Sequence, residues 1–426
     1  MTEHMDVPGP RKSGADLAFI DSLVGDMDAR LAAADAALTS GYPGDAPDRQ
    51  PVHTVYVPAD QFRDDLPQSW GRAALAAMDE HAKVFSSVAQ RPELVQLVRD
   101  KLSSEPIEDI RIDFEDGYGA RGDDAEDADV TMASAALARA VNGGTAAPFR
   151  GIRFKSLEAA TRRRGVRTLT MFVSHYLEQG GSLDDFVVTL PKITSVEQVE
   201  AMVELTGRLE QVLGIESRSL RFELQIETPQ SILGPDGAAL VARMIHVGDR
   251  RVTALHYGTY DYSAFCGISA GHQSMEHPVA DHAKLVMQTA AAGTGVRLSD
   301  GSTNVLPTGD EASVRRGWEL HARLVERSLE RGFYQGWDLH PAQLPTRFAA
   351  TFGFYRDGYV DAARRLQDYT GKVESNVMDE PATARALADF VLRGVDCGAI
   401  SAAEVRGDTG LDSRTLSDLA RPRRSE

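Results

Sequence analysis

Cysteine is scarce in this chain: Cys266 and Cys397 are the only two among 426 residues. Two cysteines cannot build a disulfide framework, and by themselves they cannot complete a thiolate zinc site. Basic residues are outnumbered, with 46 lysines and arginines against 63 aspartates and glutamates, for a formal net charge of −17. This excess of negative charge argues against nucleic acid or an anionic membrane as the main partner.

Long apolar runs are also missing. No stretch approaches the roughly 20 residues that a membrane-spanning helix needs, and residues 1–14 lack an apolar signal core. We therefore expect a cytoplasmic protein. The hydrophobic content of 42% is that of an ordinary folded protein, and the chain is long enough for one large domain with extensions.

Eight short runs rich in β-branched and aromatic residues recur along the chain, with helical patterns between them. They cover residues 52–58, 110–116, 149–155, 186–192, 221–227, 252–261, 295–301 and 337–341. This rhythm predicts an α/β fold of the TIM barrel type, (β/α)8. The alternative, a doubly wound open sheet, should carry a glycine-rich phosphate loop after its first strand. Val57-Pro-Ala-Asp60 stands there instead, which favours the barrel.

Helical patterns flank the predicted barrel. Apolar residues recur at helical spacing from 15 to 38, and further helical segments are predicted at 359–368, 382–393 and 402–420. We therefore divide the chain into an N-terminal helical extension (1–50), a catalytic TIM barrel (51–350) and a C-terminal helical extension or lid (351–426).

Two carboxylates stand at the ends of neighbouring predicted strands. Glu227 precedes Thr228-Pro229, and a proline cannot continue a central strand; Asp261 follows the next strand along the chain. Neighbouring parallel strands could place both acids at one rim of the barrel. Two hard oxygen ligands suit a magnesium ion that keeps its other positions for water and substrate. The alternative is two solvated acids that merely follow strands.

The second predicted strand ends in three acids, Asp113, Glu115 and Asp116, which cannot all be buried without partners. Either they face solvent, or they hold a metal's waters and an arginine. Arg153 and Lys155 are two residues apart on the third strand and so point to the same side. If that side is the interior, Arg153 lies near these acids, in an active site or as a structural ion pair.

Two other clusters of charged and polar residues suggest metals at first reading. The acidic run 122–129 lacks the spacing of an EF-hand calcium loop. It precedes a helical pattern, and its negative charges would stabilise the positive N-terminal end of that helix. A second cluster mixes histidines with a glutamate, but its spacing matches no common zinc signature. It consists of His272, Glu276, His277 and His282.

Six motifs occur in a fixed order: Asp-Phe-Glu-Asp116, Arg153, Leu-Pro-Lys-Ile193, Ile-Glu-Thr-Pro229, Gly-Thr-Tyr-Asp261 and Leu-His-Pro341. In this order they resemble the citrate lyase beta-subunit-like family, which includes the malyl-CoA lyases and belongs to the wider aldolase and malate synthase group. The resemblance covers roughly residues 52–393.

The resemblance implies a barrel in which Glu227 and Asp261 hold a magnesium ion and Arg153 grips the substrate's oxo or carboxylate oxygens. It also implies a supporting acidic shell and further substrate-binding residues. The acidic shell would be Asp113, Glu115 and Asp116, and the substrate-binding residues Lys192, Pro229 and His340. Members of the family commonly form trimers or hexamers, so we expect a homo-oligomer without nucleic-acid or membrane partners.

The chain departs from the family pattern at three places. The first strand ends in Pro58-Ala59 where Pro-Gly is usual, and compact members have no counterpart of the N-terminal helix. The Asp-Gly pair that supplies a catalytic acid in the malyl-CoA lyases appears here as Glu374-Ser375. By this match Glu374 would be the general acid or base. These changes concern the coenzyme A half of the substrate more than the metal half.

Together these features predict a magnesium-dependent carbon–carbon lyase or condensing enzyme. Its substrate would be a small 2-oxo acid or its 3-hydroxy adduct, as the free acid or as a coenzyme A thioester. The alternative reaction at the same site is a malate synthase-like condensation or a thioester hydrolysis. The alternative from another class is a metabolite-binding barrel without catalysis, against which the joint presence of Glu227, Asp261 and Arg153 argues.

Overall fold

The computed structural model describes residues 17–46, 48–371 and 380–421. The chain divides into two compact units, Met1–Pro43 and Gly44–Glu426. The first unit contributes one described helix, α1 (Leu17–Gly41), over the range where the sequence predicts one. The second unit contains all the described strands, and the helices after residue 350 belong to it together with the barrel. Within the described ranges, no helix is both long and apolar enough to cross a bilayer.

Eight parallel strands form a nearly closed barrel in the order β7-β6-β5-β4-β3-β2-β1-β8, and a bridge between Ser299 and Gln335 links its two edges. The predicted TIM barrel is confirmed, and each strand overlaps the range predicted for it. The strands are β1 (His53–Pro58), β2 (Asp109–Asp113), β3 (Phe149–Arg153), β4 (Phe186–Leu190), β5 (Arg221–Ile226), β6 (Val252–Tyr257), β7 (Arg297–Ser299) and β8 (Gly336–Asp338).

Alternation along each strand separates an apolar outer face from a polar interior. In β2, Ile110 and Ile112 are buried under the helices, whereas Arg111 points to the opposite side. Its Nη2 atom lies 2.6 Å from Oε2 of Glu223 on β5, a strand that is not its neighbour in the sheet. The contact therefore crosses the barrel interior. The same alternation directs positions 113, 153, 225 and 227 toward the inside at the carboxyl end.

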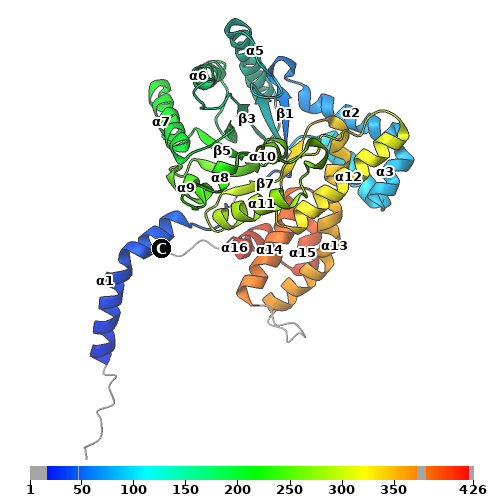
Figure 1. Ribbon diagram of the computed structural model, residues 1–426. Helices are drawn as coiled ribbons and strands as arrows, with labels where there is room; N and C mark the ends of the chain where they lie inside the picture. Colours follow the sequence, from blue (N-terminus) through cyan, green and yellow to red (C-terminus); the bar gives the residue numbers. More distant parts are fainter. Residues whose placement is uncertain (1–16, 47, 372–379, 422–426) are drawn as a thin grey trace, which may run out of the picture. The chain divides into compact units, whose positions relative to one another are not determined.

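Helices cover the outside of the strands (Figure 1). Those between the strands are α2 (Leu66–Glu80), α3 (Ala82–Ala89), α4 (Pro92–Ser104), α5 (Asp123–Asn142), α6 (Arg162–Glu178), α7 (Val196–Leu213), α8 (Pro229–Ile232), α9 (Leu240–Val247), α10 (Thr259–Phe265), α11 (Pro278–Ala291) and α12 (Glu311–Glu330). Short 3-10 turns are η1 (Ala59–Gln61), η2 (Ala270–His272) and η3 (Pro341–Gln343). The acidic run at 122–129 forms the first turns of α5, where its charges meet the helix's positive end.

The chain ends in a group of helices that pack on one another: α13 (Leu344–Gly371), α14 (Pro381–Asp396), α15 (Ala402–Thr409) and α16 (Ser413–Ala420). Two details differ from the sequence-based prediction. The helix expected to start at 359 begins at Leu344, because its first residues, 344–352, are buried on all sides and lack the amphipathic spacing that predicts a helix. The helix expected over 402–420 is two helices, because Gly410 at φ 73° ends α15 and the side chain of Asp412 caps α16.

Candidate active site

Asp113 and Arg153 lie opposite each other in the register of β2 and β3. Arg153 donates from Nε to Oδ1 and from Nη2 to Oδ2 of Asp113, each at 2.7 Å, and both side chains are buried. The Asp113 oxygens also accept the backbone N–H groups of Glu115 (3.0 Å) and Gly117 (2.9 Å). A Cβ on Gly117 would come within 2.7 Å of Oδ2, so this close approach needs glycine. Asp113 is saturated and acts by positioning Arg153.

The Arg153 guanidinium keeps donors for a ligand after this pairing. Its Nη1 atom lies 3.3 Å from Oε1 of Gln225 and 3.6 Å from a carboxylate oxygen of Glu115. The Tyr56 ring lies under it, 4.7 Å from ring centroid to Cζ. Of five N–H groups, Asp113 takes two and Gln225 one. The rest can bind a carboxylate or oxo oxygen in fork geometry.

Lys192, directly after β4 and Pro191, gathers acids from three segments. Its Nζ lies 2.8 Å from Asp261, 3.0 Å from Asp116 and 3.3 Å from Glu115. Its backbone N–H donates to Oε1 of Glu227 at 2.8 Å. We call Glu115, Asp116, Glu227 and Asp261 the carboxylate cluster. Burial alone would lower the pKa of the Lys192 ammonium, but these negative charges outweigh burial and raise it.

Glu227 is the deepest member of the carboxylate cluster, with 2% of its surface exposed. Its Oε1 accepts the Lys192 backbone N–H, and its Oε2 accepts the side-chain amide of Gln225. Burial raises the pKa of Glu227 to about 8, since neither Lys192 nor Arg153 fully offsets the loss of water. A Cβ at Gly258 would come within 2.5 Å of the Glu227 Cβ, so β6 can pass this side chain only with glycine there.

The second-strand acids behave as two different groups. Burial, only partly offset by Arg153, raises the pKa of Glu115 to about 7, so this carboxyl can hold or release a proton near neutral pH. Burial would also raise the pKa of Asp116, but hydrogen bonding with Glu115 and the charges of Arg153 and Lys192 lower it instead. The predicted acidic shell is therefore assembled at one place.

The donor chemistry of the carboxylate cluster fits a hard divalent cation. Three of the carboxylates contact the Lys192 ammonium, and the fourth and deepest, Glu227, accepts the Lys192 backbone N–H and has lost much of its contact with water. In the described part of the chain, no three His, Cys, Asp or Glu side chains form a metal site by themselves. By the family resemblance, Glu227 and Asp261 would be the protein ligands, with water and substrate completing the sphere. Magnesium suits such a partial protein site.

A family model with the description "Domain of unknown function (DUF6986)" matches residues 31–424. The chain belongs to this family. A search of curated proteins found no match. Since the match spans nearly the whole chain, the barrel and the helices that follow it are both part of what defines this family.

Solved structures show what the fold is like. A citrate lyase from Burkholderia xenovorans aligns with a TM-score of 0.55 and 18% identity, over 84% of this chain and 99% of that one. Malate synthase of Haloferax volcanii, in a magnesium and glyoxylate complex, aligns with a TM-score of 0.48 and 13% identity, over 87% of this chain and 97% of that one. Protein CitE of Mycobacterium tuberculosis, in complex with magnesium, acetoacetate and coenzyme A, aligns with a TM-score of 0.48 and 16% identity, over 83% of this chain and 99% of that one. The first alignment confirms that the chain shares the citrate lyase-like fold.

Two of the predicted site residues stand apart from the carboxylate cluster. Pro229 is the first residue of α8, where it stops β5 just after Glu227. The His340 ring accepts the backbone N–H of Ala342 at 3.1 Å and caps η3. Among the described residues, no hydrogen bond or ion pair joins it to the cluster. Glu374 lies outside the described residues.

Two residues of the site were not found from the sequence. Gln225 bridges Arg153 and Glu227, and Tyr56 packs its ring against Arg153. The signal for Gln225 was present, because it lies two residues before Glu227 on a strand and so faces the same side. Tyr56 carries no comparable signal, since its contact joins strands that are remote in sequence.

Proposed function

We propose that this chain is a magnesium-dependent lyase or condensing enzyme that breaks or forms a carbon–carbon bond in a small 2-oxo acid or its 3-hydroxy adduct. The observation that supports it is the carboxylate cluster beside Arg153 at the carboxyl end of the barrel, where TIM-barrel enzymes carry their active sites. In such a reaction, negative charge develops on a carbonyl-derived oxygen. A metal ion held by the carboxylate cluster and the Arg153 guanidinium would both stabilise that charge.

Glu227 and Asp261 would hold the metal ion. Bound there, magnesium would supply Lewis-acid stabilisation of the negative charge that develops in the reaction. The Lys192 ammonium contacts Asp261, so it would have to move off this carboxylate for a divalent cation to be held there. Its backbone N–H would continue to orient Glu227, because that bond does not depend on the side chain.

Arg153 would bind and orient the substrate acid. Asp113 and Gln225 fix the plane of its guanidinium, and Tyr56 supports one face, so its remaining N–H groups are preorganised. A preorganised donor stabilises developing charge without reorganising during the reaction. The buried position strengthens the effect, because little water screens it. Glu374 remains the predicted general acid or base.

The test is to incubate the full chain with magnesium, one of glyoxylate, pyruvate or oxaloacetate, and one of several acyl-CoA thioesters, and to follow products by mass spectrometry. A new or broken carbon–carbon bond is expected, and free coenzyme A without it would indicate thioester hydrolysis instead. Asp261→Asn should remove the activity. Asp236→Asn, which loses an exposed ion pair with Arg243, is the matched control. Turnover that persists in a chelator would refute the proposal.

A further inference from the structure

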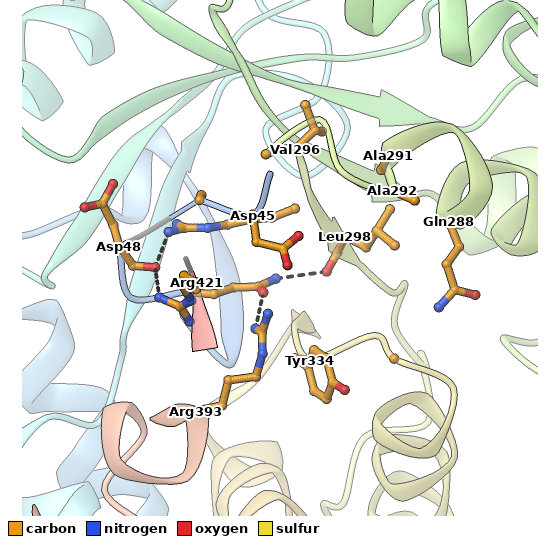
Figure 2. Close-up of a pocket in the computed structure, with 15 residues that line it drawn as sticks. Asp45, Asp48, Gln288, Ala291, Ala292, Val296, Leu298, Tyr334, Arg393 and Arg421 are labelled. Atoms are coloured by element: carbon orange, nitrogen blue, oxygen red, sulfur yellow. Dashed lines mark hydrogen bonds between the residues drawn. The ribbon is translucent and has the colours of Figure 1, made fainter. Parts of the chain in front are cut away.

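A polar cavity lies at the amino end of the barrel, beside the starts of β7 and β8, and Figure 2 shows side chains that line it. Its volume is about 180 Å³. Three arginines from separate elements line it: Arg297 begins β7, Arg393 lies on α14, and Arg421 follows α16. The active-site residues described above contribute nothing to this cavity.

Two of these three arginines form ion pairs with carboxylates. The Nε atom of Arg393 lies 2.7 Å from Asp389, and its guanidinium stacks 4.3 Å from the centroid of the Tyr334 ring. Arg421 reaches the same Asp389 at 3.3 Å and Asp396 at 4.0 Å. These carboxylates neutralise their two partners but leave the third cation without a counter-charge in contact.

Among the described residues, Arg297 has only a neutral hydrogen-bond partner. Its Nη2 donates to the backbone oxygen of Asp48 at 2.6 Å, and Nη1 of Arg421 donates to the same oxygen at 3.3 Å. No carboxylate of the described residues lies within 4 Å of the Arg297 guanidinium, and Figure 2 shows the Asp48 carboxylate turned away from Arg421. Two cations thus crowd one carbonyl. Burial lowers the pKa of Arg297 to about 10, and Arg421 and Arg393 contribute to this in spite of attraction from Asp48.

We propose that this cavity, which we call the arginine cavity, binds a small oxyanion through Arg297, with Arg393 and Arg421 beside it. The ligand class is a compact metabolite bearing a carboxylate or phosphate group, which the guanidinium fork matches in geometry. An anion there would supply the counter-charge that Arg297 lacks. Asp45 also lines the cavity and its negative charge would disfavour large polyanions. The inference does not depend on the proposed reaction.

Thermal unfolding and calorimetry of the full chain test this site, in a chelator so that no metal contributes. Inorganic phosphate and succinate are the two probes, each compared with sodium chloride at equal ionic strength. A ligand that binds only the folded state raises the melting temperature. We expect at least one probe to do so, and the probe with the larger shift distinguishes a phosphate from a carboxylate ligand. Arg297→Ala should weaken its binding by about tenfold or more, since a charge-assisted hydrogen bond is lost.

Three further variants make the result specific. Arg297→Lys keeps the charge and loses the fork, so it should bind more weakly than wild type and more tightly than Arg297→Ala; it also serves if the alanine variant does not fold. Arg243→Ala removes an exposed arginine elsewhere and should respond as wild type does. Arg153→Lys should keep the part of the response that Arg297→Ala loses, because Arg153 lies at the opposite end and any succinate bound there is a separate contribution. An equal response of wild type and Arg297→Ala, or no response of wild type to either probe, overturns the proposal.

Discussion

The two ends of this barrel carry opposite excesses of charge. At the carboxyl end, Lys192 contacts four carboxylates, three through its ammonium and Glu227 through its backbone N–H. At the amino end, three guanidiniums line a cavity, and carboxylates of the described residues contact two of them. Between the ends, Arg111 pairs with Asp109 and Glu223 in the interior. An excess of one charge marks where a ligand of opposite sign would be stabilised.

The carboxyl end gives the largest expected effect. Asp261→Asn should remove one of two metal ligands and cost several kcal/mol of transition-state stabilisation, on the order of a 10³-fold loss of turnover. Calorimetry should show weaker magnesium binding, and circular dichroism an unchanged fold, since Asp261 is partly exposed. Unchanged magnesium affinity would mean that Asp261 is not a ligand.

A buried acid whose charge is compensated by its neighbours serves as the reference for the two ends of the barrel. Asp338 at the end of β8 is buried and contacts Arg347 (3.0 Å), His53 (2.8 Å) and His321 (3.0 Å). Burial would raise its pKa, but Arg347 and the two histidines outweigh burial and hold the pKa well below its usual range. Asp338→Asn leaves Arg347 unpaired and should lower the free energy of unfolding by about 3 kcal/mol at pH 7.

The pH dependence follows from the sign of that pKa shift. A carboxyl with a depressed folded pKa contributes its full stability above the unfolded value of about 3.9, and loses it as pH falls toward the folded value. Urea unfolding at pH 7, 5 and 3 should therefore show a wild-type advantage over Asp338→Asn that holds to pH 5 and shrinks at pH 3. An advantage that grew on acidification would contradict the assigned pairing.

A substitution of Arg153 distinguishes a cation that acts in the active site from one that only stabilises the fold. Arg153→Lys keeps a positive charge near Asp113 but loses the fork that can serve Asp113 and a substrate together. We expect about a 10²-fold fall in kcat/KM, with a smaller effect on stability than Arg153→Ala, which leaves Asp113 buried and unpaired. Near-normal turnover of Arg153→Lys would support the structural ion pair alone.

The smallest effect concerns Lys192. Lys192→Met removes the ammonium that occupies the carboxylate cluster while keeping the backbone N–H bond to Glu227 and a similar side-chain length. Both side chains are unbranched at Cβ, so the positive φ of 51° at this position is equally tolerated. Magnesium affinity measured by calorimetry should rise by about tenfold, or about 1.4 kcal/mol. A fall in affinity would show instead that the ammonium assists binding.

The sequence alone determined the barrel and its carboxylates. Alternating runs such as 110–116, and stop signals such as Pro229 after Glu227, are local patterns, and local backbone physics places such residues at strand ends. Because parallel strands present their carboxyl ends at one rim, Asp113, Arg153 and Glu227 can be grouped from the sequence.

Tertiary structure alone decided what each charge touches. That Lys192 enters the carboxylate cluster, that Gln225 links Arg153 to Glu227, and that Arg297 shares one carbonyl with Arg421 all depend on segments remote in sequence. Strand periodicity states which side a residue faces, but distances across a barrel depend on its closure and on helix packing. A pKa depends on those distances and on lost water, so the raised values at Glu115 and Glu227 emerge only in the folded chain.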